Sequence, residues 1–292
     1  MKILTISPNP LLNLLAPCAL NTGKSTRIPA FTVSAEGKGV NVAKVLVRHG
    51  YEAMTAFFSG GHSGAWFADL LLQQGVKSVI VPVKAPMRLG FLAPGDPATA
   101  MLEDGFAVTA AEVETFFRML DDLLPQVGMV IASGAVPDRS MLDFYPRLVE
   151  RCHRACVPCW CDTYGAPMAA LLASGLSIDL AKPNRQEFAS ASGWERIAEL
   201  HLTDGAAGVS IQRYGQETHR LTPPLVQEVN ATGSGDSYVA GLAHARLQGW
   251  PFERQLAYAA ACGAANARTL AVAEIDPAEA LALMDQATIQ TL

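Results

Sequence analysis

Strand-like and helix-like stretches alternate along most of this chain, and this alternation constrains its fold more than any other feature. Residues 2–7, 52–58 and 127–132 are short apolar runs typical of buried strands, whereas residues 38–49 are amphipathic with helical spacing. A helix that joins two parallel strands must cross over the face of their sheet, so the alternation predicts a mainly parallel sheet. We therefore expect a three-layer α/β fold with helices on both faces.

The other predicted elements continue the same rhythm. Strands are expected over residues 78–83, 157–162 and 177–180, and helices over residues 63–74, 109–124, 138–155 and 166–173 and from residue 184 onward. Three Ala-rich helices are expected to follow, over residues 236–248, 252–270 and 277–286. Thr109 and Glu112 have the spacing of a capping box, which places one helix start firmly.

Two stretches, residues 9–35 and 84–107, interrupt the rhythm. Both are rich in Pro, Gly and Thr and follow predicted strands, so they leave the sheet at its carboxyl edge. Open α/β sheets bind ligands at that edge. We predict that the two stretches form a small, discontinuous β lid, and that residues 1–292 form a single domain.

The composition argues against several functions. The chain has 292 residues, a formal net charge of −5 and no Lys- or Arg-rich run, so we expect no nucleic-acid partner. It has no run of about 18 apolar residues, and Pro8 ends the first apolar stretch, so we expect neither a membrane span nor a signal peptide. A cytoplasmic location is the resulting expectation.

Four cysteines lie within ten residues and raise the question of a metal site. Cys152, Cys156, Cys159 and Cys161 accompany His153, but their spacing lacks the paired C-x-x-C typical of zinc. Two of them fall in a predicted helix and two in the following strand. We interpret them as buried thiols in a reducing compartment, with metal binding as the alternative.

The sharpest local motif is Thr232-Gly-Ser-Gly-Asp-Ser237, which directly precedes an Ala-rich helix. Gly233 and Gly235 allow a tight turn whose N–H groups converge, and a helix N-terminus adds partial positive charge. Together with Ser234 they suit a phosphate or a developing phosphoryl charge. Asp236 would lie beside that anion and accept a proton from an attacking hydroxyl; the alternative is that it only caps the helix.

Two further motifs carry polar groups at predicted helix starts. Gly37 and Gly39 permit close backbone approach to a ligand, and Asn41 offers a donor and an acceptor to sugar hydroxyls. Asn184 and Glu187 follow Lys182-Pro183 and lie three residues apart on one helical face, where their oxygens suit hydrated Mg²⁺. A tight turn and an ordinary helix start are the respective alternatives.

Two rival nucleotide-binding motifs fail on spacing. The run Thr22-Gly-Lys-Ser-Thr26 imitates the end of a P-loop, but Cys18 stands where the first glycine is required. The Gly-x-Gly turns suggest dinucleotide binding, but Val42 and Tyr238 occupy the positions of the third small residue. Both readings are therefore disfavoured.

Taken together, the motifs resemble those of the ribokinase-like (PfkB) carbohydrate kinases. The match is best to the branch of 1-phosphofructokinase and tagatose-6-phosphate kinase, over the runs TISPNP at residues 5–10, GKGVNVAKVL at 37–46, KPNRQE at 182–187 and TGSGDS at 232–237. Ser234 replaces the usual Ala. The motifs keep their order and spacing over nearly the whole chain.

The resemblance implies a phosphotransferase that uses ATP and Mg²⁺ and phosphorylates a hydroxyl of a sugar or sugar phosphate. Asp236 would act as the base, the amides of residues 233–235 would hold the transferring group, and Asn184 and Glu187 would organise Mg²⁺ through water. The implied nucleotide-binding residues are Lys182, Thr203, Gly205, Gly208 and Asn266. The implied acceptor-binding residues are Asn13, Gly37, Lys38, Gly39, Asn41, His62 and Arg88.

Several residues depart from the family pattern. Asn13 replaces an acidic residue that contacts sugar hydroxyls, His62 replaces a phosphate-binding Lys, and Gly90 replaces an Asn, while Glu36 would repel a phosphorylated sugar. Residues 188–208 are short, which implies loss of most of a helix–strand unit. These departures leave open an unphosphorylated sugar or nucleoside acceptor and a catalytically silent sugar-binding protein. The family's lids also suggest a homodimer.

Overall fold

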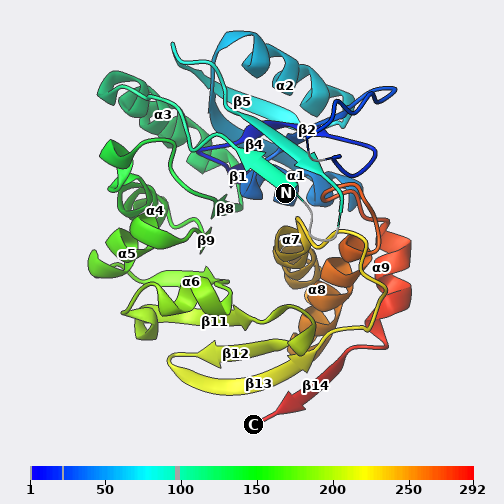
Figure 1. Ribbon diagram of the computed structural model, residues 1–292. Coiled ribbons are helices and arrows are strands. Elements are labelled where there is room, and N and C mark those ends of the chain that lie inside the picture. Colours follow the sequence, from blue (N-terminus) through cyan, green and yellow to red (C-terminus); the bar gives the residue numbers. More distant parts are fainter. Residues whose placement is uncertain (1, 22, 96–98) are drawn as a thin grey trace.

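A ten-stranded sheet forms the centre of the molecule (Figure 1). The computed structural model describes residues 2–21, 23–95 and 99–292. The strand order is β14-β13-β12-β11-β10-β9-β8-β1-β4-β5, parallel from β11 to β5 and antiparallel from β11 to β14. The strands are β1 Lys2–Ile6, β4 Glu52–Ser59, β5 Lys77–Pro82, β8 Met129–Ser133, β9 Cys159–Asp162, β10 Ile178–Ala181, β11 Ile197–Thr203, β12 Val209–Arg213, β13 Gln216–Thr222 and β14 Thr288–Thr291.

Helices cover both faces of this sheet and divide the core in two. One core lies under α1 (Lys38–Arg48), α2 (Gly61–Gln73), α7 (Ser234–Leu247), α8 (Phe252–Ala267) and α9 (Pro277–Met284), and the other under α3 (Ala110–Leu123), α4 (Phe144–Arg154) and α5 (Gly165–Ala173). Successive residues of β1 show why: Ile3 belongs to the first core and Leu4 to the second. A strand whose neighbouring side chains are both buried needs cover on both faces. The predicted three-layer α/β fold is confirmed.

The strand order reverses beside β1. The chain passes from β1 to β4 and β5 on one side, and then returns to β8, which pairs with the other edge of β1. Such a reversal leaves a crevice at the carboxyl ends of the two strands, where open α/β sheets bind ligands. A functional site is therefore expected at the residues that follow β1, β8 and β9.

A second sheet of four strands is built from the two stretches that interrupt the rhythm. Its order is β3-β2-β6-β7, with β2 Leu11–Leu15, β3 Thr32–Glu36, β6 Leu89–Ala93 and β7 Thr99–Leu102. Strands β2 and β3 contact α2. The turn between β6 and β7 contains residues 96–98, which lie outside the described residues.

The structure differs from the sequence expectation in two places. The helix expected over 138–155 begins only at Phe144, because the Asp138 side chain accepts from the Ser140 N–H and ends the chain's extended path in a short 3₁₀ turn, Arg139–Met141. Residues 188–208 were expected to lack most of a helix–strand unit. The strand part of this expectation is wrong, because β11 is present, whereas the helix before it, α6 (Arg185–Ala189), is short. The capping box of Thr109 and Glu112 forms as predicted.

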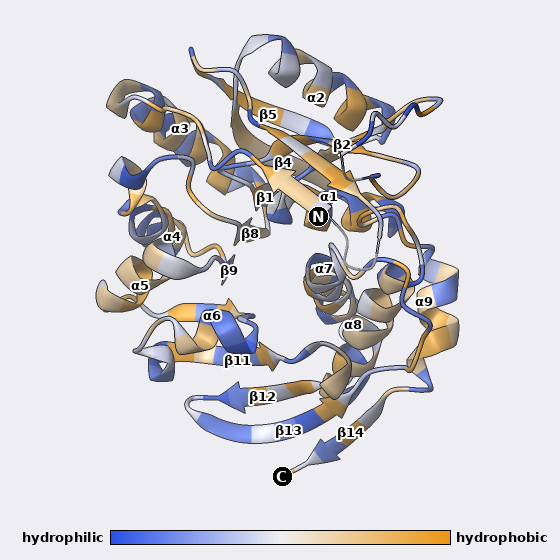
Figure 2. Ribbon diagram, in the orientation of Figure 1, coloured by the Kyte–Doolittle hydropathy of each residue, from blue (hydrophilic) through white to orange (hydrophobic). Residues whose placement is uncertain are grey.

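Phe188 and Trp194 fill part of the space beside the short α6. Their rings stack with centroids 5.2 Å apart, and Trp194 is buried against the core under α3–α5. Beyond them the sheet becomes more polar, and Figure 2 shows β12 and β13 as more hydrophilic than β4. The layer of α3–α6 thus ends before it reaches β12–β14.

The cysteine cluster is divided between the two predicted elements. Cys152 of α4 and both cysteines of β9 are buried, whereas Cys156 is exposed; the Sγ atoms of Cys159 and Cys161 are 3.9 Å apart. Within the described residues, no three His, Cys, Asp or Glu side chains lie in an arrangement that could hold a metal ion. In the same part of the chain, no helix has the length and apolar character needed to cross a membrane.

Candidate active site

The glycine-rich motif forms the start of α7. Gly233 is the N-cap residue with φ = +83°, a left-handed conformation that favours glycine, and its missing side chain also leaves room for Val272. The first-turn amides of α7 follow it, with no side-chain cap to occupy them. The Ser234 N–H donates to the Ala231 carbonyl oxygen at 3.1 Å, and a positively polarised helix start without a side-chain cap can bind an anion.

Asn266 of α8 holds the glycine-rich loop before α7 in place. Its Nδ2 donates to the Thr232 carbonyl at 2.8 Å and to Ser234 Oγ at 3.0 Å, and its Oδ1 accepts from the Ala273 N–H at 2.7 Å. Asn266 is fully buried. The side chain therefore holds the glycine loop in place, and only the second lone pair of Oδ1 remains for the predicted contact with the nucleotide.

Asp236 lies in the first turn of α7 and is 6% exposed. Its Oδ2 accepts from Asn41 Nδ2 at 2.7 Å. Burial raises the pKa of Asp236 to about 6, although the charge of Lys38 and the bond from Asn41 oppose this rise. Its carboxylate is thus ionised at neutral pH but basic enough to take a proton.

The two glycines of the first motif serve the approach of α1 to β1. Gly37 is the N-cap residue of α1 with φ = +150°, and a Cβ on Gly39 would lie 2.3 Å from the Ile6 carbonyl oxygen. Because the glycines bring α1 against the end of β1, the helix directs Asn41 at Asp236. The close approach here is between two backbone segments, where a ligand was expected.

A cluster of charges lies at the carboxyl end of β9. Lys38 Nζ is 3.5 Å from Asp162 Oδ1 and 3.1 Å from Glu187 Oε1, and Lys182 Nζ is 3.6 Å from Asp162 Oδ2. Burial alone would lower the pKa of Lys38, but the two carboxylates outweigh burial and raise it above its usual value. The cluster joins α1, β9 and the start of α6 beside Asp236.

Lys182 also links this cluster to the glycine loop. A Cβ on Gly235 would lie 2.9 Å from Lys182 Nζ, so the glycine leaves room for the ammonium group directly at the start of α7. Lys182 is 5% exposed. Two lysines therefore bring positive charge to the point where the amides of α7 converge.

Asp162 is a site residue that sequence reasoning missed. It ends a strand that was predicted correctly, and a carboxylate at the carboxyl end of a parallel strand is a signal that could have found it. Its Oδ2 is buried and has no hydrogen-bond partner among the described residues.

The side chains of the site can hold Mg²⁺, but through a different pair from the predicted Asn184 and Glu187. Asn184 Oδ1 accepts from the Glu187 N–H and Glu187 Oε2 accepts from the Asn184 N–H, so this pair forms a capping box. Asn184 thus uses its oxygen on the helix start. The carboxylate donors that suit Mg²⁺ are Asp162 Oδ2, which lies 3.6 Å from Lys182 Nζ, and Glu187 Oε1, which lies 3.1 Å from Lys38 Nζ.

The turn after β11 approaches the same edge of the sheet. Thr203 donates to the Pro183 carbonyl from both its N–H, at 2.9 Å, and its Oγ1, at 3.3 Å. Gly205 and Gly208 have φ = +52° and +116°, and a Cβ on Gly208 would lie 2.4 Å from the Leu221 carbonyl oxygen. The turn is thereby held against the start of α6.

Arg88 and His62, which were expected to bind a phosphate of the acceptor, have different surroundings. Arg88 is engaged by backbone: it donates to the carbonyl oxygens of Asn9, Pro10 and Glu103 at 2.8–3.3 Å. His62 lies exposed in the first turn of α2. In this structure Arg88 holds the second sheet together through three of its five N–H groups, which leaves one N–H on each terminal nitrogen.

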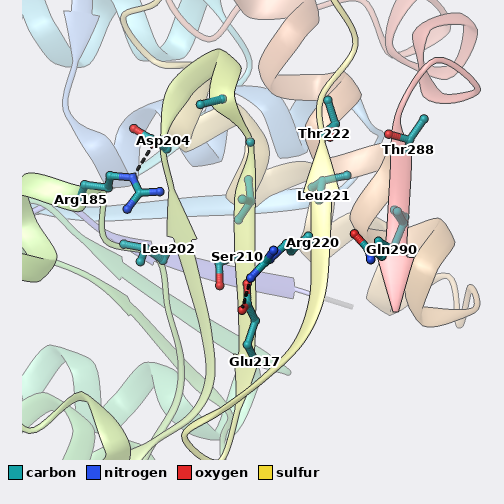
Figure 3. A pocket seen from close by; sticks show the side chains of 14 residues that line it. Arg185, Leu202, Asp204, Ser210, Glu217, Arg220, Leu221, Thr222, Thr288 and Gln290 are labelled. Atoms are coloured by element: carbon teal, nitrogen blue, oxygen red, sulfur yellow. Dashed lines mark hydrogen bonds and ion pairs between the residues drawn. The ribbon is translucent and has the colours of Figure 1, made fainter. Parts of the chain in front are cut away.

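A groove of about 580 Å³ begins at the turn after β11 and does not include Asp236 (Figure 3). It is on the outer face of β11–β14, where the layer of α3–α6 ends. Its walls carry the ion pairs Arg185–Asp204 and Arg220–Glu217. Asp236 is not among its lining residues, but Gly208 and Arg185 are, so the groove adjoins the turn after β11 and the start of α6.

The whole chain matches proteins of one fold. A possible 1-phosphofructokinase from Thermotoga maritima has a TM-score of 0.89 at 18% identity over 100% of both chains. Phosphofructokinase-2 from Escherichia coli, in complex with fructose-6-phosphate, has a TM-score of 0.82 at 20% identity over 97% and 98%. A carbohydrate kinase from Agrobacterium tumefaciens has a TM-score of 0.78 at 20% identity over 99% of both.

A three-layer sheet with a glycine-rich helix start and a buried carboxylate at its carboxyl edge is the arrangement of a small-molecule phosphotransferase. The family model described as pfkB family carbohydrate kinase matches residues 13–278. The chain belongs to this family, as the motifs predicted, and it is a phosphotransferase that acts on a sugar hydroxyl.

Proposed function

We propose that this protein transfers the γ-phosphoryl group of ATP to a hydroxyl of a sugar phosphate, with Asp236 as the base. The observation that carries the proposal is the position of Asp236: a buried carboxylate in the first turn of α7, bonded to Asn41 and flanked by Lys38 and Lys182. A base must lie where the acceptor hydroxyl meets the phosphoryl group, and this helix start suits both.

The proposed step transfers the γ-phosphoryl group from ATP to the acceptor hydroxyl. Asp236 accepts the proton of the acceptor hydroxyl while the hydroxyl oxygen bonds to the γ-phosphorus of ATP and the bond to the β–γ bridging oxygen breaks. The products are the phosphorylated sugar, ADP and one proton. The amides of Gly233 and Gly235 would hold the transferring group, since the Ser234 N–H donates to the Ala231 carbonyl oxygen at 3.1 Å, and Lys182 would balance its charge.

ATP and Mg²⁺ are part of this proposal. Bound Mg²⁺ would neutralise charge on the ATP phosphates, and Asp162 and Glu187 are the residues that would hold it. Thr203, Gly205 and Gly208 would line the nucleotide side, since their turn lies against the start of α6. Lys38 would keep Asp162 and Glu187 in place.

The acceptor is proposed from the family and from the neighbours of known structure, two of which are described as phosphofructokinases. These comparisons do not favour the alternatives of an unphosphorylated acceptor or a silent sugar-binding protein. Three backbone hydrogen bonds hold Arg88 in place, and its two remaining N–H groups would be the ones to contact the phosphate of the acceptor.

The test is ADP release measured with Mg²⁺ and ATP across fructose 1-phosphate, fructose 6-phosphate, tagatose 6-phosphate, ribose, fructose and nucleosides. We expect at least one sugar phosphate to give the largest kcat/KM, with one phosphorylated product formed for each ADP. A higher kcat/KM for every unphosphorylated acceptor would reject the sugar-phosphate part of the proposal and leave the kinase part intact.

The four-stranded sheet is proposed to act as a lid over the acceptor. Strand β3 runs directly into Gly37 and α1, so closure of the sheet and placement of Asn41 are coupled through the chain. We expect amides in residues 9–35 to exchange their hydrogens more slowly when a sugar phosphate is saturating. Unchanged exchange across this stretch at saturation would contradict the lid, with the amides of β8 as the internal control.

A homodimer through this sheet and a cytoplasmic location remain predictions. Edge strand β7 is exposed along its length, and the side chains of Met101 and Leu102 are 61% and 57% exposed. An edge strand with apolar side chains can pair with another chain.

A further inference from the structure

A buried carboxylate lies in the four-stranded sheet without a cationic partner. Glu36, the last residue of β3, is 7% exposed, and its Oε1 accepts from Asn13 Nδ2 at 3.0 Å and from Ser34 Oγ. It forms no salt bridge with any of the described residues, and no hydrogen bond to its Oε2 is found there. Both hydrogen bonds go to Oε1, so Oε2 remains available to a partner from outside the chain. The charge of Lys44 acts on Glu36 without forming a salt bridge.

Asn13 gives a second, independent sign of a ligand. Its side chain is 5% exposed, and its Oδ1 has no hydrogen-bond partner among the described residues. Asn13 pairs with Ser34 on one side and with Gly90 on the other, so these residues and Glu36 share one face of the sheet. Polar groups that lack partners thus gather on this face.

Gly90 provides the space that this arrangement needs. A Cβ on Gly90 would lie 2.8 Å from Asn13 Oδ1 and 2.4 Å from Leu11 Cδ1. Any larger residue would push the Asn13 side chain away from Glu36. The three departures from the family pattern at positions 13, 36 and 90 therefore form one structural unit.

The unit formed by Asn13, Glu36 and Gly90 adjoins, through Glu36, the helix that carries Asn41. Glu36 directly precedes Gly37, and one helical turn later Asn41 donates to Asp236. Asn41 Oδ1 is likewise buried without a partner among the described residues. A sugar that offers one hydroxyl to Asp236 would bring its neighbouring hydroxyls toward this part of the sheet.

We propose that Glu36, held by Asn13 and Ser34, binds hydroxyl groups of the acceptor and determines which sugar phosphate is used. A carboxylate only accepts hydrogen bonds and repels a phosphate, so it selects the hydroxyl-bearing end of the acceptor. The phosphate of the acceptor must then lie at the opposite end. This inference rests on the proposed function.

The test compares Glu36→Gln with the wild type and with Glu52→Gln, an exposed glutamate at the start of β4. Loss of hydrogen bonds to a charged group lowers kcat/KM for the preferred sugar phosphate by about 10–100-fold. The KM for ATP should stay within about twofold, and Glu52→Gln should match the wild type. Each variant's melting temperature checks its fold.

Acceptors that lack single hydroxyls identify the contact. One deoxy acceptor should lose about 10-fold or more in kcat/KM with the wild type but much less with Glu36→Gln, because the variant no longer forms that bond. Equal losses in both proteins for every deoxy acceptor, or an unchanged kcat/KM in a folded Glu36→Gln, would overturn the role of Glu36 alone. A wild type that phosphorylates no sugar phosphate would overturn the proposed function as well.

Discussion

The Asp236→Asn variant is expected to lose about 10²–10⁴-fold in the rate of sugar-dependent ADP formation. Asparagine keeps the size of the side chain and can still accept from Asn41 Nδ2, but it cannot take a proton at neutral pH. The binding of ATP and of the sugar phosphate, measured by calorimetry, should change little. A rate close to that of the wild type would remove Asp236 from its role as base.

The same variant is expected to be more stable than the wild type at pH 8. Burial raises the pKa of Asp236 to about 6, above the 3.8 of an unperturbed aspartate, so the folded state favours the protonated form. Its stabilising contribution is complete below pH 3.8 and is lost as the pH rises through about 6. At pH 8 the charged group costs about 2–3 kcal/mol, which asparagine avoids.

Thermal melts at two pH values check this prediction. Asp236→Asn should melt several degrees above the wild type at pH 8, and the gap should narrow at pH 5, where the wild-type carboxyl is mostly protonated. A melting temperature below that of the wild type at pH 8 would show that the charges of Lys38 and Lys182 fully compensate for the burial of the ionised Asp236 carboxylate. The base assignment and the burial account are thus tested separately.

The Asn41→Asp variant is expected to shift the pH dependence of the reaction. It places a second carboxyl group where the Asn41 amide now donates to Asp236 at 2.7 Å. Two carboxyl groups at this distance share one proton, which strongly raises one of their pKa values. We expect kcat/KM at pH 7 to fall by about 10-fold or more, and the lower limb of the profile to move up by about one pH unit or more.

Asn41→Leu is the matched control for this shift. It removes the same hydrogen bond but adds no charge, so its profile should move less than that of Asn41→Asp. If Asn41→Asp keeps the wild-type profile, then residue 41 and Asp236 do not interact in the working enzyme, and the site geometry would be contradicted.

The elements that could be predicted from sequence are those set by local chemistry. The start of α7 follows from two glycines and an aspartate within four residues, and the capping box of Thr109 and Glu112 needs only its own spacing. The helix–strand alternation gave the three layers because a buried strand needs cover on both faces. Local sequence was less reliable at the start of α4, where Asp138 stabilises a separate turn.

The parts that could not be predicted depend on distant partners. The place of Asp162 at a strand end could be read from sequence, but its contact with Lys38 spans 124 residues and could not. Arg88 was expected at a phosphate from the family pattern, but the fold surrounds it with carbonyl oxygens. The bond from Asn13 Nδ2 to Glu36 spans 23 residues and depends on the pairing of β2 with β3.

The pH dependence of kcat/KM for the sugar phosphate, measured in the wild type and in Asp236→Asn, tests the central claim most directly. The wild type should lose activity below about pH 6, where Asp236 becomes protonated, and this inflection should be absent from the residual activity of the variant. The same inflection in both proteins would mean that another group takes the proton from the acceptor.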